Sequence, residues 1–221
     1  MFALPLVLAL LASPVVTAEA KLHIDVPEFR ISKVQGQEPG TRSEPRHRTF
    51  DTLLVFLSTG SVRVSGEKQR PLTLNHDVSH VLWRPAGTRD VIENLGAAPL
   101  SFFEVEIKDR VGAKRLKRFP DLDPVAIDHK HYQTLFENKK IRVVRALVNP
   151  GDNIPMHQHD TTRVNIFVTK HQVRVTDPQG VAKEGNEPPG SVKVGGPCKH
   201  DEVSLSDQIM DTVIIDSKFL P

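Results

Sequence analysis

Three histidines have the residue type and spacing expected of a metal site. His157 and His159 stand two residues apart at the start of an expected strand, so both imidazole rings project from the same face. His200 follows a turn-rich segment and leads into another expected strand. We expect the three side chains to bind one divalent metal ion, and imidazole ligands do not distinguish Fe, Zn, Mn, Ni and Cu. The alternative is that some of them are surface residues, which is the interpretation for the other seven of the 10 histidines.

Arg163 is the candidate for binding a substrate. Alternation along the strand after His159 puts Arg163 on the same face as His157, with its guanidinium group directed into the expected cavity. A guanidinium fork matches a carboxylate, so we expect the ligand to be a small organic anion. The alternative is a structural salt bridge from Arg163 to Glu202 or Asp160.

The single cysteine, Cys198, lies two residues before His200 and would share its face in an extended segment. It could be a fourth, soft metal ligand or an oxidisable neighbour, whereas a lone cysteine is more usually a small buried apolar residue. His129 and His131 repeat the two-residue spacing but are assigned to a linker, and His171 is assigned to a turn. One cysteine also excludes an intrachain disulfide.

The elements that must position these residues form a duplicated unit. Gly40 and Gly151 are 111 residues apart, and so are the segments 61–65 and 172–176, which read SVRVS and QVRVT. A period near 110 residues is too long for a solenoid repeat, so it favours a duplicated domain.

Both halves consist of short segments rich in β-branched residues and separated by Gly, Pro, Asn or Asp, while helical periodicity is almost absent. Together with 17 prolines, this pattern predicts an all-β chain of antiparallel sandwiches or barrels. Strands are expected at 52–57, 62–65, 81–83, 101–107, 141–148, 164–169, 173–176 and 212–215.

The segment Gly151–His159 resembles the first motif of the cupin superfamily, a glycine followed after five residues by His-x-His. The second cupin motif, Pro-x-Gly-x-x-His-x-x-x-Asn, is matched in part around His200. In the first half, Asp90 stands in the place of the histidine of that second motif, and Arg46 and Arg48 stand in the places of the histidine pair. The resemblance implies two double-stranded β-helix, jelly-roll-like barrels packed against each other. It also implies that the first barrel is degenerate and that only the second is competent to bind metal.

The resemblance also bears on function. Many cupins supply a glutamate ligand three or four residues after His-x-His, and Arg163 and Val164 occupy those positions here. A site without a carboxylate would be strongly electropositive. The chain then resembles small-molecule dioxygenases, which are metal-dependent oxidoreductases. The alternative is a non-catalytic binder of a metal or a small anion, which the missing glutamate slightly favours. A third alternative, if the three histidines do not converge, is a purely structural protein that binds no metal.

Residues 1–20 have the apolar run and the small-x-small ending of a secretory signal peptide, so the mature chain is expected to begin at Lys21. We expect export, to a periplasm or out of the cell, without a membrane anchor. The chain has 29 basic and 27 acidic residues, and the basic ones are scattered, which excludes a nucleic-acid binder. Oligomerisation is left open. The expected domains are 21–108 and 129–221, joined by a linker at 109–128.

Overall fold

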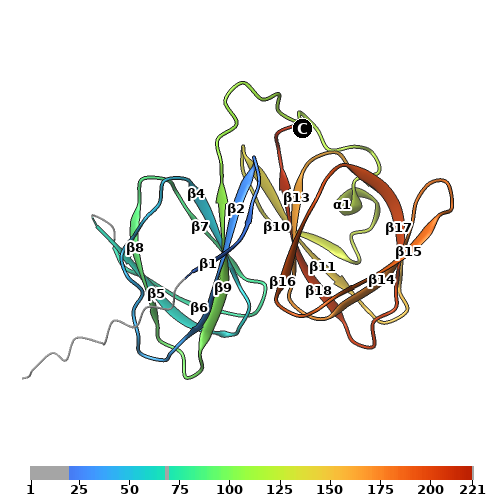
Figure 1. Ribbon diagram of the computed structural model, residues 1–221. Helices are drawn as coiled ribbons and strands as arrows, with labels where there is room; N and C mark the ends of the chain where they lie inside the picture. Colours follow the sequence, from blue (N-terminus) through green and yellow to red (C-terminus); the bar gives the residue numbers. More distant parts are fainter. Residues whose placement is uncertain (1–19, 68–69, 221) are drawn as a thin grey trace, which may run out of the picture.

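The structure is a computed structural model that describes residues 20–67 and 70–220. The predicted signal peptide therefore lies outside the described residues, apart from its last residue. Figure 1 shows two barrels side by side, one built from the first half of the chain and one from the second. Within the described residues, no helix is long and apolar enough to cross a membrane.

The first barrel consists of a five-stranded and a four-stranded antiparallel sheet, in the orders β1-β2-β9-β4-β7 and β3-β8-β5-β6. Its strands are β1 (Lys21–Asp25), β2 (Phe29–Gln37), β3 (Arg46–His47), β4 (Asp51–Phe56), β5 (Gly60–Gly66), β6 (Leu72–His76), β7 (Val81–Arg84), β8 (Arg89–Asn94) and β9 (Leu100–Ile107).

The second barrel repeats this arrangement strand for strand, with sheets in the orders β10-β11-β18-β13-β16 and β12-β17-β14-β15. Adding nine to each strand number of the first barrel gives the second, so the duplication predicted from the sequence is present in the topology. The strands are β10 (Tyr132–Glu137), β11 (Ile141–Val148), β12 (Asn153–His159), β13 (Arg163–Phe167), β14 (His171–Thr176), β15 (Ala182–Glu187), β16 (Ser191–Gly195), β17 (Cys198–Ser204) and β18 (Met210–Ser217).

These observations confirm the all-β prediction and the two barrels. Each of the eight expected strands corresponds to an observed one, and β11 has the predicted bounds. The repeated glycine is explained by its backbone: Gly40 and Gly151 have φ values of 70° and 77°, in the left-handed region that favours glycine. One local expectation differs, because His157 and His159 end strand β12 rather than begin a strand.

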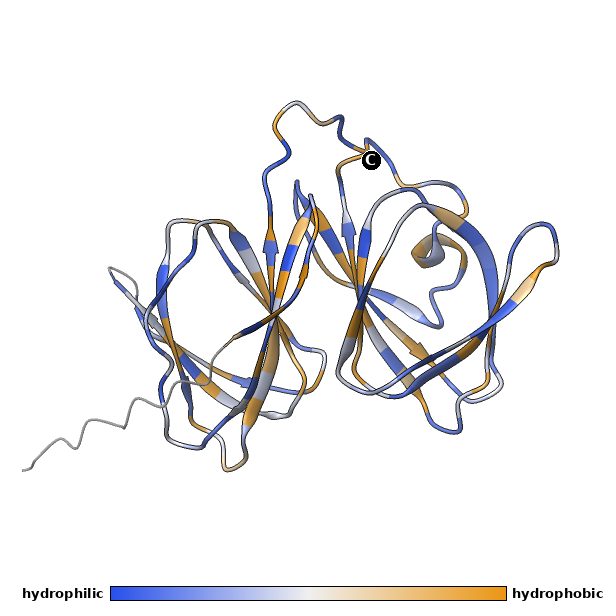
Figure 2. Ribbon diagram, viewed as in Figure 1, coloured by the Kyte–Doolittle hydropathy of each residue, from blue (hydrophilic) through white to orange (hydrophobic). Residues whose placement is uncertain are grey.

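A shared apolar core joins the two barrels through their five-stranded sheets. Leu53 and Val105 of the first barrel belong to the same buried cluster as Val143 and Ile215 of the second. Alternate residues of these strands face the other way, into their own barrels, so both faces of each sheet are buried. Figure 2 shows the hydrophobic residues concentrated on the strands where the barrels meet. The predicted pairing of the two barrels within one chain is therefore present.

The connection between the barrels packs against the second barrel over its last part. A short helix, α1 (Pro124–Ile127), contacts β12 and β10. Just before it, Asp123 is buried and forms a bidentate ion pair with Arg142 of β11, with N to O distances of 2.9 and 2.6 Å. The basic residues at 114, 115, 117 and 118 are exposed. The second half of the connection therefore closes one end of the second barrel.

Candidate metal centre

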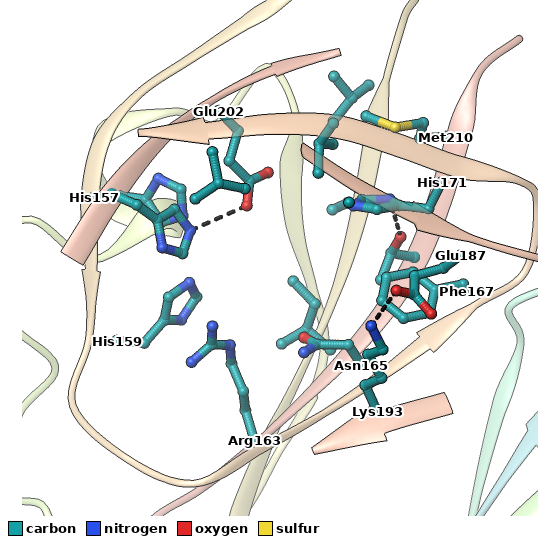
Figure 3. Close-up of a pocket in the computed structure, with 18 of the residues that line it drawn as sticks. His157, His159, Arg163, Asn165, Phe167, His171, Glu187, Lys193, Glu202 and Met210 are labelled. Carbon is teal, nitrogen blue, oxygen red and sulfur yellow. Dashed lines mark hydrogen bonds and ion pairs between the residues drawn. The ribbon is translucent and has the colours of Figure 1, made fainter. Parts of the chain in front are cut away.

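The second barrel encloses a cavity of about 310 Å³. Its walls come from the inward faces of both sheets, and Figure 3 shows the labelled side chains around it. His157 and His159 reach it from β12, and His200 reaches it from the neighbouring strand β17. His157 and His200 are direct cross-strand partners, so the antiparallel register brings the predicted third histidine to the pair.

The three histidines converge as the sequence predicted. One ring nitrogen from each of His157, His159 and His200 lies within 4.8 Å of the others, and all three side chains are buried. The Nδ1 atom of His157 lies 3.0 Å from the carbonyl oxygen of Pro155. Donation of the Nδ1 proton to that oxygen leaves Nε2 as the free acceptor, and this buried Nε2 has no hydrogen-bond partner within the described chain. A buried imidazole nitrogen with an available lone pair fits a divalent metal ion.

The electrostatics of the pair on β12 favour the form of histidine that binds metals. Burial lowers the pKa of His157. Burial, together with the guanidinium group of Arg163, lowers the pKa of His159 far below its usual range. Both rings are therefore neutral at neutral pH, and a neutral imidazole is the ligand form.

A carboxylate stands beside the histidine cluster, although it lies outside the set of mutually close ligand atoms. Oε1 of Glu202, two residues beyond His200 on β17, lies 3.0 Å from Nε2 of that histidine. Burial alone would raise the pKa of Glu202, but the contact with His200 outweighs it and lowers the pKa to about 2. Sequence alternation could have found Glu202, because residues two apart on a strand share a face. The expectation missed it because the glutamate was sought after the histidine pair on the other strand.

Arg163 lines the cavity beside His159, as Figure 3 shows. Its guanidinium group donates to the carbonyl oxygen of Gly196 at 2.5 Å and to Sγ of Cys198 at 3.2 Å. Neither alternative ion pair, to Glu202 or to Asp160, is formed within the described chain. These two contacts use two of the five N–H donors of an arginine and hold the group at the edge of the histidine cluster.

Cys198 is half-buried next to the cluster. Its Sγ lies 3.3 Å from Nδ1 of His200 and accepts the hydrogen bond from Arg163. Burial alone would raise the pKa of this thiol, but the contacts with His200 and Arg163 lower it. Cys198 does not belong to the set of mutually close ligand atoms, so it contacts the cluster from outside.

The interpretation of the remaining histidines as surface residues is wrong for three of them. His76 is buried against Phe56 in the first barrel. His131 is buried between Asp128, 2.7 Å from Nδ1, and a second carboxylate, so it is a structural residue of the second barrel rather than part of a linker. His171 begins strand β14 and lines the cavity, because the preceding turn lies two residues earlier in the chain than expected.

The first barrel has charged groups where the second has the histidine cluster. Arg46 and Asp90 are cross-strand partners at the positions that match His157 and His200. Asp90 is buried and forms ion pairs with Arg48 at 3.0 Å and with Arg84 at 2.5 Å. Glu104 accepts from both Arg46 and Arg48. The guanidinium groups satisfy these carboxylates and would repel a cation.

Comparisons with known proteins agree on the fold. No protein-family model and no curated protein sequence matches this chain. Among solved structures, AerE from Microcystis aeruginosa is similar with a TM-score of 0.62 and 13% identity, covering 90% of this chain and 96% of that one. Oxalate decarboxylase from Bacillus subtilis, with Mn(II) centres, gives a TM-score of 0.62 and 13% identity over 86% of this chain and 69% of its own. A cupin 2 conserved barrel domain protein from Leptotrichia buccalis is similar with a TM-score of 0.56 and 12% identity, and the match covers 95% of this chain and 93% of that one. The chain therefore has the cupin fold in its two-barrel arrangement.

Proposed function

We propose that this protein is a metal-dependent oxidoreductase of the dioxygenase type that acts on a small organic anion in its second barrel. One divalent metal ion would be held by His157, His159 and His200. The observation that carries the proposal is the convergence of three buried imidazoles, one of which has a buried nitrogen without a partner among the described residues. The Mn(II) centres of the oxalate decarboxylase with the same fold support a metal at this place.

The carboxylate of Glu202 favours an enzyme over a non-catalytic binder. A missing carboxylate was the reason to prefer the binder, and Glu202 removes that reason because it stands beside His200 in the wall of the cavity. A carboxylate in such a place can accept a proton from a bound substrate. A bound divalent ion would supply Lewis acidity for an oxyanion.

The other polar groups of the cavity bind and orient the ligand. Arg163 is fixed by Gly196 and Cys198, and its remaining N–H donors are available to an anion beside the histidine cluster. Tyr132, fully buried, packs its ring 6.0 Å from that of His157 and helps to exclude water from this end. Exclusion of water strengthens each of these charge interactions.

Metal analysis tests the first half of the proposal. Protein purified without a chelator or a nickel column should contain one equivalent of metal per chain. The double variant His157→Ala/His159→Ala should lose it, whereas the matched double variant of two exposed histidines, His23→Ala/His47→Ala, should keep it. Two equivalents in the wild type, or one equivalent retained in the first variant, would overturn the proposal.

Oxygen consumption tests the second half. The metal-loaded protein should consume dioxygen when small aromatic carboxylates or phenolates are added, and the Glu202→Gln variant should consume it more slowly while still binding them. Binding without consumption across such a panel would contradict an oxidoreductase and leave the non-catalytic binder.

Export belongs to the same proposal. The signal-peptide pattern of residues 1–20 supports a mature protein in the periplasm or outside the cell. The ligand would then be a molecule met outside the cytoplasm.

A further inference from the structure

The cavity of the second barrel has a second polar end, away from the metal centre. Figure 3 shows His171 on the side of the cavity opposite His157 and His159, and Asn165 between His171 and Arg163. Both residues line the cavity. Asn165 lies two residues beyond Arg163 on β13, which places it about 7 Å further along the same face.

The polar groups at this end lack protein partners on the cavity side. The side-chain amide of Asn165 makes no hydrogen bond to any residue that the structure describes. His171 uses only Nδ1, which lies 3.3 Å from Oγ1 of Thr212, and its ring packs 4.7 Å from that of Phe167. Burial lowers the pKa of His171, so the ring is neutral, and its Nε2, which has no hydrogen-bond partner among the described residues, can donate or accept one hydrogen bond.

Apolar side chains also line the cavity. They include Val148, Val173, Met210 and Ile214. The volume of about 310 Å³ equals about ten water molecules at the roughly 30 Å³ that each occupies in the liquid. A two-carbon anion at the metal centre would leave the apolar walls and the far polar groups uncovered. Unpaired polar groups in a cavity are costly unless a ligand or water satisfies them.

At the mouth, Glu187 and Lys193 form an ion pair with each other. Both residues line the cavity, and the lysine side chain is largely exposed. Because the two charges compensate each other, the far end is polar without carrying a net charge. It therefore suits a neutral hydrogen-bonding group rather than a second anion.

We propose that the second barrel selects elongated organic anions with an apolar body and a neutral hydroxyl or carbonyl group at the far end, which Asn165 and His171 recognise. This inference rests on the proposed function, because the anionic end is placed at the metal and Arg163. It adds two specificity-determining residues, and it adds Thr212 as the positioning residue for the His171 ring.

Binding of a matched pair of acids to the Zn²⁺-loaded protein tests the inference without any turnover. The probes are phenylpropanoate and its para-hydroxy derivative, measured by calorimetric titration. One added hydrogen bond predicts about three- to tenfold tighter binding of the hydroxylated acid by the wild type. In Asn165→Leu and in His171→Phe, the two acids should bind with about equal affinity. Phenylpropanoate itself should still bind to both variants.

Two further variants keep the experiment decisive. Asn186→Leu, the same change at an exposed position of β15 outside the cavity, should retain the preference. Thr212→Val should reduce it, because the His171 ring loses its orienting partner. Zinc content is measured for each variant to confirm an intact metal centre.

The outcomes separate the two proposals. Equal binding of both acids by the wild type, or an unchanged preference in Asn165→Leu and His171→Phe, would overturn this inference alone. Failure of the protein to bind zinc, or of the zinc form to bind either acid, would overturn the proposed function and this inference with it.

Discussion

The Nε2 atom of His200 lies 3.0 Å from Oε1 of Glu202, which stands two residues later on the same strand. Burial alone would lower the pKa of this histidine, but its contacts with Cys198 and Glu202 outweigh burial and raise the pKa to about 9. The third histidine of the cluster therefore differs from the other two, whose pKa values are lowered. A carboxylate next to a histidine ligand orients the ring and increases its basicity.

Replacement of Glu202 by glutamine should weaken metal binding about 10- to 100-fold, because glutamine keeps the size of the side chain but removes the negative charge beside His200. Competition titration against a chelating dye would measure this affinity. The matched control is Glu184→Gln on β15, where the glutamate is exposed and pairs with Arg174. Equal metal affinities in Glu202→Gln and the wild type would remove Glu202 from the metal centre.

Replacement of Arg163 by glutamate should weaken the binding of small carboxylates to the metal-loaded protein and tighten metal binding, because a positive partner of the anion becomes a carboxylate near the metal. Arg163→Lys should weaken carboxylate binding less, since it keeps the charge and loses only the planar fork. Calorimetric titration would compare these variants with Arg174→Glu, a charge reversal at an exposed position. Unchanged carboxylate affinity in Arg163→Glu would show that this arginine is only structural.

Asp90 should make the first barrel sensitive to acid. Burial would raise the pKa of this carboxyl group, but hydrogen bonds from Arg84 and Arg48 outweigh burial and lower it from 3.8. A lowered pKa in the folded state contributes stability above the unfolded value of 3.8, and this contribution is lost as the pH falls through the folded value.

The Asp90→Asn variant should therefore cost about 3 kcal/mol of unfolding free energy near neutral pH and less at about pH 3, because it removes a buried negative charge beside two guanidinium groups, and the wild type loses the same charge when Asp90 is protonated. Urea unfolding at the two pH values measures both costs. Asp25→Asn, which removes an exposed carboxylate that pairs with Arg30 and Lys108, should cost much less than Asp90→Asn. A cost for Asp90→Asn that does not depend on pH would contradict the assignment.

The core between the barrels should be sensitive to truncation. Ile215 of β18 is fully buried in the cluster shared by the two five-stranded sheets. Ile215→Ala should lower the free energy of unfolding by about 2 to 5 kcal/mol through lost burial and the cavity left behind. Urea unfolding would measure this loss and compare it with that of Ile209→Ala. Ile209 is half-exposed, so the matched change there should cost about 0.5 kcal/mol or less. Equal costs would show that the barrels do not stabilise each other through this core.

Expression in a bacterial host with an export pathway should give a mature chain that begins at Lys21. The small-x-small ending before this residue is the pattern that signal peptidase cleaves. Amino-terminal sequencing of protein from the periplasmic fraction would check it. Uncleaved protein confined to the cytoplasm would contradict export.

The all-β fold, the duplication and the pairing of His157 with His159 follow from the sequence because each is a pattern along the chain. The repeated Gly40 and Gly151 mark the same left-handed turn in both halves. Arg163 lines the cavity, but alternation from His159 does not explain this, because β12 ends at His159 and Arg163 begins β13 in the other sheet. His157 and His159 share a face because they are two residues apart, a relationship that needs no tertiary contact.

Only the tertiary structure decided what surrounds these residues. Glu202 lies beside the histidine cluster because the register of β12 and β17 makes His157 and His200 partners, and a register between distant strands is set by packing rather than by either strand alone. The same reason applies to His171 and Asn165, which meet in one cavity only after two sheets close into a barrel. The sequence by itself thus determines which side chains share a strand face, and closure of the barrel decides which faces meet.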